Sequence, residues 1–580
     1  MRTLSRLKAG LAAVALPVVM MAAGACGAAE EPAPTPTRAP AAVATPTPAP
    51  TTTPTPAGEQ PKYGGIAVLA HRVDPPSWDN MVNPDLYLTL IGGALWGPGN
   101  LVTPCREDVF QVCPYLAESW ESNADFTAWT FKVRDDVLWH DGTPFTAKDV
   151  KWWLDLSVNG SPPARKPAVY APRMGPIEKV DVVEGNKVRI ILRDPVGVFP
   201  ALFTDRSVRI THPPHLMQPE INKGNATVSP HEVGYVSTGP FKMLKYDKGS
   251  NVQVRKFDKY WEKDQRGRQL PFMNGVDYPI IPEGAAGLAA FRSGRIDRTA
   301  VGLGSYLIPE QRATLKQEMG DKANIVLFPA YGKAIGMNAR KAPYNDVRVR
   351  QALSLWIDRQ SYINGVDSGD GELLAVFAPK SPYTNPDFRE WPGWNPKTRE
   401  QDRVRAKQLL AEAGYPSGFK VNVVAATFGV RQGEWLVGDL AGLLGAANLK
   451  LEVLDIATYN NRICAGGFDL LQPISSGVVN RHLPELVAAG YSSTNKCAYF
   501  QHDDKKVDEL FGRIAATGDP ATRVKLAREL EKYLSIEQWL AINVSAERQY
   551  VAFRDYVKGW PVPAWNPENN ADYATTWLDK

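Results

Sequence analysis

A tract of proline, threonine and alanine divides this sequence into parts that must behave differently. Residues 30–60 read EEPAPTPTRAPAAVATPTPAPTTTPTPAGEQ. The tract lacks aromatic residues and nearly all branched aliphatics, and its prolines remove backbone hydrogen-bond donors. It cannot build a hydrophobic core, so we expect residues 26–61 to form an extended, semi-rigid and disordered tether.

The segment before this tract has the layout of an export signal. Basic residues open the chain, residues 10–23 are almost wholly apolar, and small residues precede Cys26. The apolar run is shorter than the about 20 residues that span a membrane, and the order of the parts is typical of a signal peptide. The motif AGAC resembles the lipoprotein box, in which the thiol receives lipid, although Ala23 stands where leucine is usual.

We therefore expect residues 1–25 to be a lipoprotein signal peptide. Lipidation of Cys26 would hold the protein on the outer face of the cytoplasmic membrane, in a periplasm or at a cell surface. The alternative is an ordinary secreted protein in which this cysteine is incidental.

Composition limits what the remaining chain can be. About 520 residues follow the tether, which is too long for one core and predicts two or three domains. The net charge is only +4 and no block of lysine and arginine stands out, so nucleic acid is not an expected partner. The 16 tryptophans and 21 tyrosines permit a pocket that binds by stacking.

Four cysteines follow Cys26, and an even number in an exported chain suggests disulfides. We expect Cys105 to pair with Cys113 and Cys464 to pair with Cys497; the alternative is free buried thiols. The spacing fits no zinc site, because no CxxC motif occurs.

The most informative stretch of the body is AWTFKVRDDVLWHDGTPFTAKDVKWWLDL, residues 128–156. AWTFKVR alternates like a strand, DG predicts a turn, and Thr146 with Asp149 forms a helix cap before VKWWLDL. Further along, STGPFKMLKYDKGSNVQVRKFDKYW, residues 237–261, reads as two strands joined by a turn at 247–250. A helix over VRAKQLLAEAGYP should end at Gly414. The second half reads as α/β, and the first half is richer in strands.

Eight stretches in one order resemble the large substrate-binding proteins of peptide-type ABC importers, which form solute-binding family 5. They are LAESWE, WTFKVRDDVLWHDGTPFTAKDVKWWL, TGPFKMLKYD, FDKYW, SGRID, APYNDVRVRQALSLWIDR, AKQLLAEAGYP and FDL. Together they cover nearly all of residues 62–580. The resemblance implies an α/β fold of the periplasmic-binding-protein type II, with two lobes, two crossover strands and an extra subdomain in lobe I.

Transferred to this chain, the family layout gives three parts. Lobe I would combine residues 62–104, 207–324 and 545–580, the extra subdomain would be 105–206, and lobe II would be 325–544. The crossovers would lie near Phe328–Tyr331 and Ala541–Val544, where short strands can absorb a hinge rotation.

The resemblance also implies a function. A small solute, by default an oligopeptide, would bridge both lobes, shift the population toward the closed form and be delivered to the transmembrane subunits of an ABC permease. The protein would be a monomer and not an enzyme. No cofactor and no metal site is expected.

In peptide-binding relatives an acidic residue after the FDL-like strand holds the peptide amine. Here that position falls on Val478, and no acid occurs before Glu485. The segment instead offers polar groups for a ligand: Ser475, Ser476, Asn480 and Arg481. Arg481 suits a carboxylate or phosphate; the alternative is a solvated loop charge.

Further ligand-contacting positions come from the same resemblance. Asp85 and Leu86 would lie at the cleft with Trp96 nearby, and Tyr331 would lie at the first crossover. Arg462 resembles a family arginine that meets a ligand carboxylate, and Phe428 and Trp435 would form an aromatic wall. Each of these side chains has a purely structural alternative.

Other functions remain open from the sequence. The missing acid and the tryptophans favour an oligosaccharide as an alternative solute, and a haem or nickel chelate is a further option. A secreted hydrolase would need a nucleophile–base pair or two facing carboxylates, and no GxSxG or HExxH motif occurs. A sensor that signals to a receptor cannot be separated from a transporter by sequence.

Overall fold

A computed structural model describes most of the folded body. The described residues are 60–83, 86–105, 110–162, 164–205, 207–282, 284–301, 307–475, 483–560 and 573–580. The predicted signal peptide, Cys26 and nearly all of the predicted tether lie outside them, as do Asp85, Ser476, Asn480 and Arg481. The predictions for these residues stay predictions.

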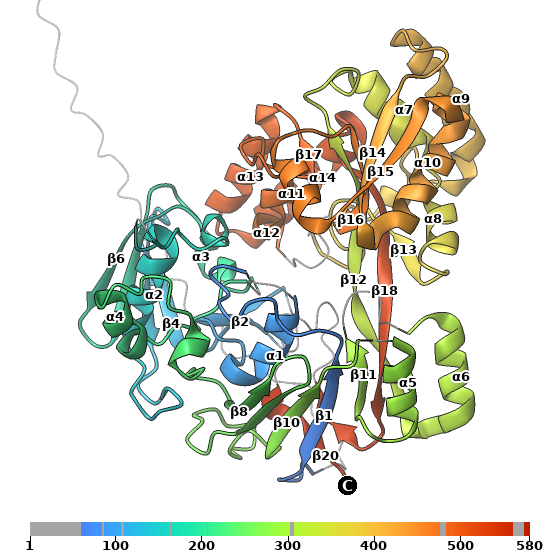
Figure 1. The fold of residues 1–580 in the computed structure, drawn as a ribbon. Helices are drawn as coiled ribbons and strands as arrows, with labels where there is room; N and C mark the ends of the chain where they lie inside the picture. Colours follow the sequence, from blue (N-terminus) through green and yellow to red (C-terminus); the bar gives the residue numbers. More distant parts are fainter. Residues whose placement is uncertain are drawn as a thin grey trace, which may run out of the picture. The chain divides into compact units, whose positions relative to one another are not determined.

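One sheet of twelve strands forms the backbone of the fold (Figure 1). Its main path runs β15-β14-β16-β12-β18-β11-β1-β10-β9-β8, with β13 paired to β18 and β17 paired to β12. In chain order, the bounds are β1 Ile66–His71, β8 Phe241–Asp247, β9 Asn251–Lys256, β10 Gly275–Pro279, β11 Arg298–Val301, β12 Ala323–Asn338, β13 Gly371–Leu373, β14 Val421–Ala426, β15 Leu449–Leu454, β16 Leu470–Ser475, β17 Phe500–Gln501 and β18 Ile542–Arg554.

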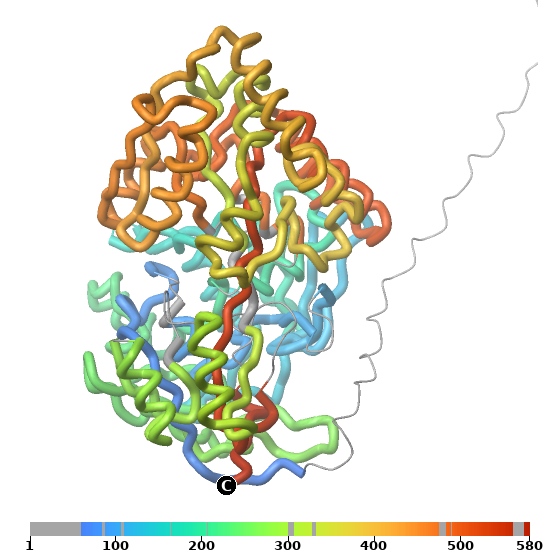
Figure 2. The backbone as a smooth tube through the Cα atoms, turned by 90° about the vertical axis from the view of Figure 1, so that its right-hand side faces the viewer, coloured from blue at the N-terminus to red at the C-terminus, as the bar shows by residue number. Residues whose placement is uncertain are grey.

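Two long antiparallel strands, β12 and β18, lie side by side at the middle of this path (Figure 2). At one end β18 pairs with β11, and at the other end β12 pairs with β16. Their register shifts between Phe328 and Tyr331 and again between Lys333 and Ala334. Irregular pairing weakens a ladder locally and bends the strand, so these shifts mark the place where the two halves of the sheet can move.

The register of β12 and β18 shows which part of β18 faces the predicted first crossover. Phe328 and Tyr331 pair with Gln549 and Glu547, whereas Ile542 and Asn543 pair with Ile335 and Ala334, beyond the second register shift. The part of β18 that faces the first crossover is therefore Glu547–Gln549 and not Ala541–Val544. The predicted crossover near Ala541–Val544, which came from the family layout, stays a prediction, because pairing alone does not locate a hinge.

Smaller sheets complete the strands. β4 Ala117–Ser122, β5 Ala128–Val133, β7 Lys187–Leu192 and β6 Ile177–Val183 form an antiparallel sheet in that order. β2 Val102–Pro104 pairs with β3 Val112–Pro114, and β19 Val557–Lys558 pairs with β20 Trp577–Leu578. The four-stranded sheet lies inside the proposed extra subdomain.

Fourteen α-helices are found in the described part of the chain. The first seven are α1 Leu86–Trp96, α2 Ala147–Asn159, α3 Phe199–Leu202, α4 Pro214–Asn222, α5 Gly284–Arg292, α6 Pro309–Met319 and α7 Val347–Trp356. The others are α8 Arg359–Gly365, α9 Arg399–Glu412, α10 Val430–Leu444, α11 Ile456–Cys464, α12 Pro484–Tyr491, α13 Lys505–Ala516 and α14 Pro520–Lys532.

Several local predictions are confirmed. The AWTFKVR strand is β5, and α2 follows Thr146, whose backbone N–H donates to the carboxylate of Asp149 at 2.6 Å. The two strands predicted within residues 237–261 are β8 and β9. Helix α9 ends two residues before Gly414, which has a φ of +91° that favours glycine.

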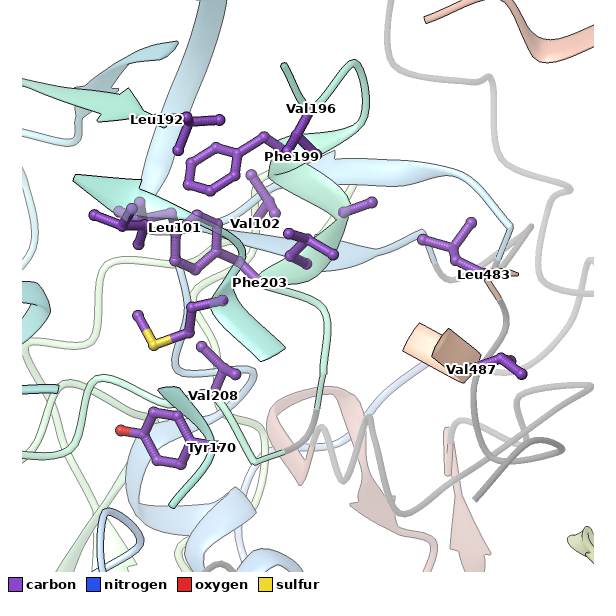
Figure 3. Close-up of a cluster of buried hydrophobic side chains, with 14 of the residues drawn as sticks. Leu101, Val102, Tyr170, Leu192, Val196, Phe199, Phe203, Val208, Leu483 and Val487 are labelled. Atoms are coloured by element: carbon purple, nitrogen blue, oxygen red, sulfur yellow. The ribbon is translucent and has the colours of Figure 1, made fainter. Parts of the chain in front are cut away.

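Separate hydrophobic cores support the halves of the sheet. Leu88, Leu95 and Trp96 of α1 pack on β1 and β10 in one core, and α7, α9 and α10 build another against β12 and β14. A third cluster includes Phe199 and Phe203. Leu483 and Val487 belong to this same cluster, so it joins α12 to the proposed extra subdomain (Figure 3).

Candidate ligand-binding site

Three strands meet where the sheet changes from one half to the other. Lys333 of β12 pairs with Ser475 of β16 on one side and with Ser545 of β18 on the other. Tyr331 lies two residues before Lys333, and residues 476–482 follow Ser475 directly. The structure therefore brings the backbones of Tyr331 and Ser475, two predicted site residues, to neighbouring strands.

Charged side chains gather at this junction. The Lys333 ammonium lies 3.1 Å from the Glu547 carboxylate, and both side chains are largely buried. Asp367 is buried beside them and accepts a hydrogen bond from the Ser545 hydroxyl at 2.6 Å. Burial, with a further contribution from Glu547, raises the pKa of Asp367 to about 7. One lysine thus faces two carboxyl groups, of which one is readily protonated.

Sequence reasoning did not find this group of Lys333, Asp367 and Glu547. The residues come from three distant segments: Lys333 and Glu547 lie on the paired strands β12 and β18, and Asp367 lies in the connection between α8 and β13 and accepts from Ser545 of β18.

The first acidic residue after β16 is not available to a ligand amine. Glu485 is buried in the first turn of α12, and Arg523 donates to its two carboxylate oxygens at 2.7 and 2.9 Å. Their side chains are 4% and 10% exposed. In sequence, residues 476–482 contain no acid, and the prediction that this segment lacks an amine-binding carboxylate stays a prediction because the segment lies outside the described residues.

Arg462 is already paired. Its guanidinium lies on Glu452 of β15, with nitrogen–oxygen distances of 3.1 and 3.3 Å. Glu452 also accepts from the side chain of Asn422, the second residue of β14. Arg462 therefore lies by the first residues of β14, away from the end of β16 where Ser475 lies.

The predicted aromatic residues are spread over different surroundings. Trp96 is 5% exposed and packs in the α1 core, where its ring lies against Gly92. Trp435 stacks edge-on against Tyr362 and donates to Ser361 at 3.2 Å. Phe428 is 49% exposed. Among the described ring contacts none joins Phe428 to Trp435, so the structure does not show an aromatic wall formed by this pair.

A buried ion network holds the segment that leads to Asp85 and Leu86. Asp79 accepts from Arg165 at 2.9 Å, and His212 lies 3.0 Å from its other oxygen. The side-chain nitrogen of Asn80 donates to the carbonyls of Ser207 and Arg209, and its side-chain oxygen accepts from the Thr211 hydroxyl. This network fixes the entry to α1, although the side chain of Leu86 lies outside the described residues.

Two further histidines, His140 and His215, are engaged in contacts within the fold. His140 lies 3.0 Å from the Gly239 carbonyl and accepts from the Ser237 N–H, and burial lowers its pKa to about 4. His215 lies 2.6 Å from Asp141. Within the described residues, no group of three or more His, Cys, Asp or Glu side chains is arranged to hold a metal ion.

Both suggested disulfides are present. Cys105 and Cys113 are joined within the β2–β3 hairpin, and Cys464 and Cys497 join the end of α11 to the segment after α12. The first bond closes the loop that carries Phe110, whose ring lies 6.4 Å from that of Tyr383. Each bond lies within one of the proposed domains.

The proposed extra subdomain touches the proposed lobe II at two further points. The Gly197 N–H donates to the Ala515 carbonyl at 2.7 Å. Gly197 also packs against the backbone of Thr517 and Gly518, and Gly518 packs against the Phe126 ring. We call this set, with Phe110 and Tyr383, the closing contact.

The chain matches a known family of proteins over most of its length. A family model described as bacterial extracellular solute-binding proteins, family 5 Middle, matches residues 111–495. The periplasmic oligopeptide-binding protein OppA of Salmonella typhimurium is 29% identical over 443 residues, which are 73% of this chain and 77% of that protein.

Solved structures with the same fold bind different solutes. The binding protein AgaA of A. tumefaciens R10, in complex with agropinic acid, has a TM-score of 0.71 and 22% identity, over 89% of this chain and 99% of that one. DppA of Helicobacter pylori, in complex with the peptide STSA, has a TM-score of 0.72 and 20% identity, over 90% and 99%. None of the helices in the described ranges has the length and apolar character of a membrane span.

Proposed function

Because the chain belongs to family 5 of the bacterial extracellular solute-binding proteins, we propose that it captures an oligopeptide-like solute for an ABC importer. The fold is the α/β type II fold of periplasmic binding proteins, with two lobes, and the protein works outside the cytoplasm. The observation that carries the proposal is the pair of long strands β12 and β18, with bulges where the two halves of the sheet meet.

The solute is captured when the two lobes close around it, and no chemical step is needed. A solute that touches both lobes gains its full contacts only when they are closed, so binding shifts the population toward the closed form. The bulges at Phe328 and Lys333 provide the pivot, and the closing contact provides the surface that meets on the far side. The permease then receives solute from the closed form. We propose that no bond of the solute is broken.

The oligopeptide would be held differently from the way the peptide-binding relatives hold it. Glu485 is neutralised by Arg523, and residues 476–482 offer Arg481 and Asn480 in place of an acid. We therefore propose that this loop meets a carboxylate or a neutral polar group of the solute, and not its free amine. The complex of AgaA with agropinic acid shows that this fold accepts an acidic solute that is not a peptide.

The oligosaccharide alternative loses part of its support. It rested on tryptophans that would line a cleft, yet Trp96 and Trp435 are both engaged in packing within their own halves of the molecule. Phe428 remains the exposed aromatic side chain among the three predicted.

We also propose that Cys26 carries the lipid anchor and that the tether lets a monomer reach the permease. The motif AGAC and the proline-rich tract support this. Cys26→Ser should release the protein from membranes into the soluble fraction. Retention of that variant in membranes would refute the anchor without affecting the solute-binding proposal.

The solute is best identified by binding to the purified protein. A thermal-shift panel should compare tri- to pentapeptides, the same peptides with blocked amino ends, and cello- and xylo-oligosaccharides. A true ligand raises the unfolding midpoint with the logarithm of its concentration. Blocked peptides should bind as well as free ones, because the 476–482 loop carries no acid for the amine. A response to sugars alone would contradict the oligopeptide proposal.

A further inference from the structure

A buried guanidinium in lobe I has no carboxylate partner. Arg298, the first residue of β11, is 0% exposed. Its Nη2 donates to the Ala70 carbonyl and lies 3.3 Å from His71 Nε2. Its Nε and Nη1 have no hydrogen-bond partner in the described structure. A buried charge left in this condition is expensive, because it loses its hydration without gaining a counter-charge.

The neighbouring carboxylate does not serve Arg298. Asp297 accepts from the Val68 N–H at 2.8 Å and from the Tyr556 hydroxyl, and the Lys580 ammonium lies 3.3 Å away. Its oxygens are committed to these three donors. The positive charge of Arg298 is therefore not balanced by the residue next to it.

Two further buried groups beside Arg298 also lack partners. His71 is 0% exposed, and burial together with Arg298 places its pKa well below the usual range, so the ring is neutral. Since Nε2 accepts from Arg298, the ring hydrogen is on Nδ1, which has no partner within the described residues. The Tyr278 ring packs edge-on against His71 at 5.3 Å, and its buried hydroxyl is likewise unpaired there.

These atoms have one property in common. The unpaired atoms are Arg298 Nε, Arg298 Nη1, His71 Nδ1 and Tyr278 Oη, and each of them carries a hydrogen to donate. They come from three adjacent strands, since β1 pairs with both β10 and β11 (Figure 1). The Trp560 ring, 5.7 Å from the guanidinium carbon, adds an apolar neighbour.

We infer that Arg298, His71 and Tyr278 bind one small anion, of the size of a carboxylate or a halide, inside lobe I. The acceptors beside this group are the Ala70 carbonyl, which Arg298 Nη2 uses, and the hydroxyl of Tyr573, which interacts with Arg298 and Tyr278 and itself donates to the Leu90 carbonyl. The remaining buried donors beside a positive charge favour an anion over water, which needs acceptors as well as donors to be fully satisfied. The anion comes either from solution or from a carboxylate of the captured solute. The chemistry of recognition is the same for both sources.

The first test measures the purified protein with bromide and with acetate. In each titration, sodium bromide or sodium acetate is exchanged for sodium HEPES, whose anion is too bulky for the site, so that the ionic strength stays constant. The midpoint of thermal unfolding should rise with the logarithm of the bromide or acetate concentration, by roughly 2 °C or more over two decades. Arg298→Met should remove this dependence. Arg255→Met is the matched control on the same sheet, because Arg255 is paired with Asp277, and it should keep the dependence.

The second test does not rely on a variant that must fold. Anomalous diffraction from wild-type crystals grown in bromide should show a peak within about 3.5 Å of Arg298 Nε or Nη1. Absence of this peak, or an equal anion response in wild type and Arg298→Met, would overturn the inference.

A competition experiment then identifies the source of the anion. If bromide weakens binding of an acidic solute, the solute carboxylate occupies the site; if both bind together, the anion comes from solution. Only this arm rests on the proposed solute binding, and the first two tests stand if that proposal fails.

Discussion

Arg312 and Asp370 form a two-pronged ion pair beside the strands that join the two lobes. Arg312 Nη2 lies 2.9 Å from Asp370 Oδ1, Nη1 reaches the other oxygen, and the two side chains are 19% and 17% exposed. The guanidinium also lies 3.9 Å over the ring of Tyr550 on β18. Arg312 belongs to α6 of the proposed lobe I, and Asp370 precedes β13 of the proposed lobe II. The pair therefore ties the lobes together at the pivot.

This pair should contribute to stability in a measurable way. A double-mutant cycle of Arg312→Met and Asp370→Asn, followed by urea unfolding, should give a coupling energy of about 1–2 kcal/mol, because the pair is bidentate and mostly buried. The control cycle uses Lys316 and Asp321, an exposed pair that starts on the same helix, and should give no coupling energy above the error of the measurement. Equal coupling in both cycles would contradict the assignment.

The buried carboxyl group of Asp367 predicts a pH dependence. Its folded pKa of about 7 lies above the unfolded value of about 3.9, so the folded protein binds the extra proton between these values. The contribution of this group to stability is therefore present below about pH 4 and is lost as the pH rises through 7. Asp367→Asn keeps an oxygen for the Ser545 hydroxyl and removes the titration.

Urea unfolding of wild type and Asp367→Asn at pH 5 and pH 8 checks this sign. From pH 5 to pH 8, the free energy of unfolding of wild type should fall, relative to that of the variant, by on the order of 2–3 kcal/mol. Asp258→Asn, at an exposed position, controls for the general effect of removing an acid. A wild type that gains stability over the variant as the pH rises would show that the carboxyl group prefers to be charged.

The ion network around Asp79 should be among the most sensitive points of lobe I. Burial by itself raises the pKa of Asp79, but His212 and Arg165 outweigh it and hold the pKa well below its usual range. Its stabilisation is therefore present at neutral pH and is lost as the pH falls below about 4. Asp79→Asn leaves Arg165 without its counter-charge and should lower the free energy of unfolding by about 3 kcal/mol at pH 7. A loss below 1 kcal/mol would mean that the network is not needed for folding.

The closing contact offers a steric test of lobe closure. A methyl group on Gly197 would lie 2.6 Å from the backbone of Thr517 and Gly518. Gly197→Ala should therefore hold the subdomain away from α13 and α14, and weaken solute binding by about tenfold, or about 1.4 kcal/mol. Its effect on unfolding should be smaller than its effect on affinity.

Gly512→Ala is the matched control in α13. A methyl group there meets no atom within 4 Å, and alanine favours a helix over glycine. Its solute affinity should equal that of wild type in a calorimetric titration. Unchanged affinity of Gly197→Ala would show that the closing contact is not part of the bound form.

Local signals made much of the fold predictable. Thr146 and Asp149, which are three residues apart, mark the start of α2. The alternation of apolar and polar residues before them predicts β5 from local sequence alone. The cysteine pairs were suggested by their even number and by short separations. The overall fold came from eight motifs in order, because each motif maintains one part of a shared architecture.

The candidate site was less predictable because its interactions join distant segments. Arg462 reads as a ligand-binding cation in sequence, yet Glu452 ten residues earlier neutralises it. Lys333 and Glu547 meet through the register of β12 and β18, which includes two irregularities, and Asp367 reaches them from the connection before β13. The pairing of Phe328 and Tyr331 with Gln549 and Glu547 could likewise not be read from the motifs.

The most direct test of the account is small-angle X-ray scattering of the protein before and after saturation with a peptide whose binding has been shown by calorimetry. The account predicts that the radius of gyration falls when the peptide is added, and that Gly197→Ala shows a smaller fall at the same saturation. A radius of gyration that stays constant while peptide binds would contradict capture by lobe closure.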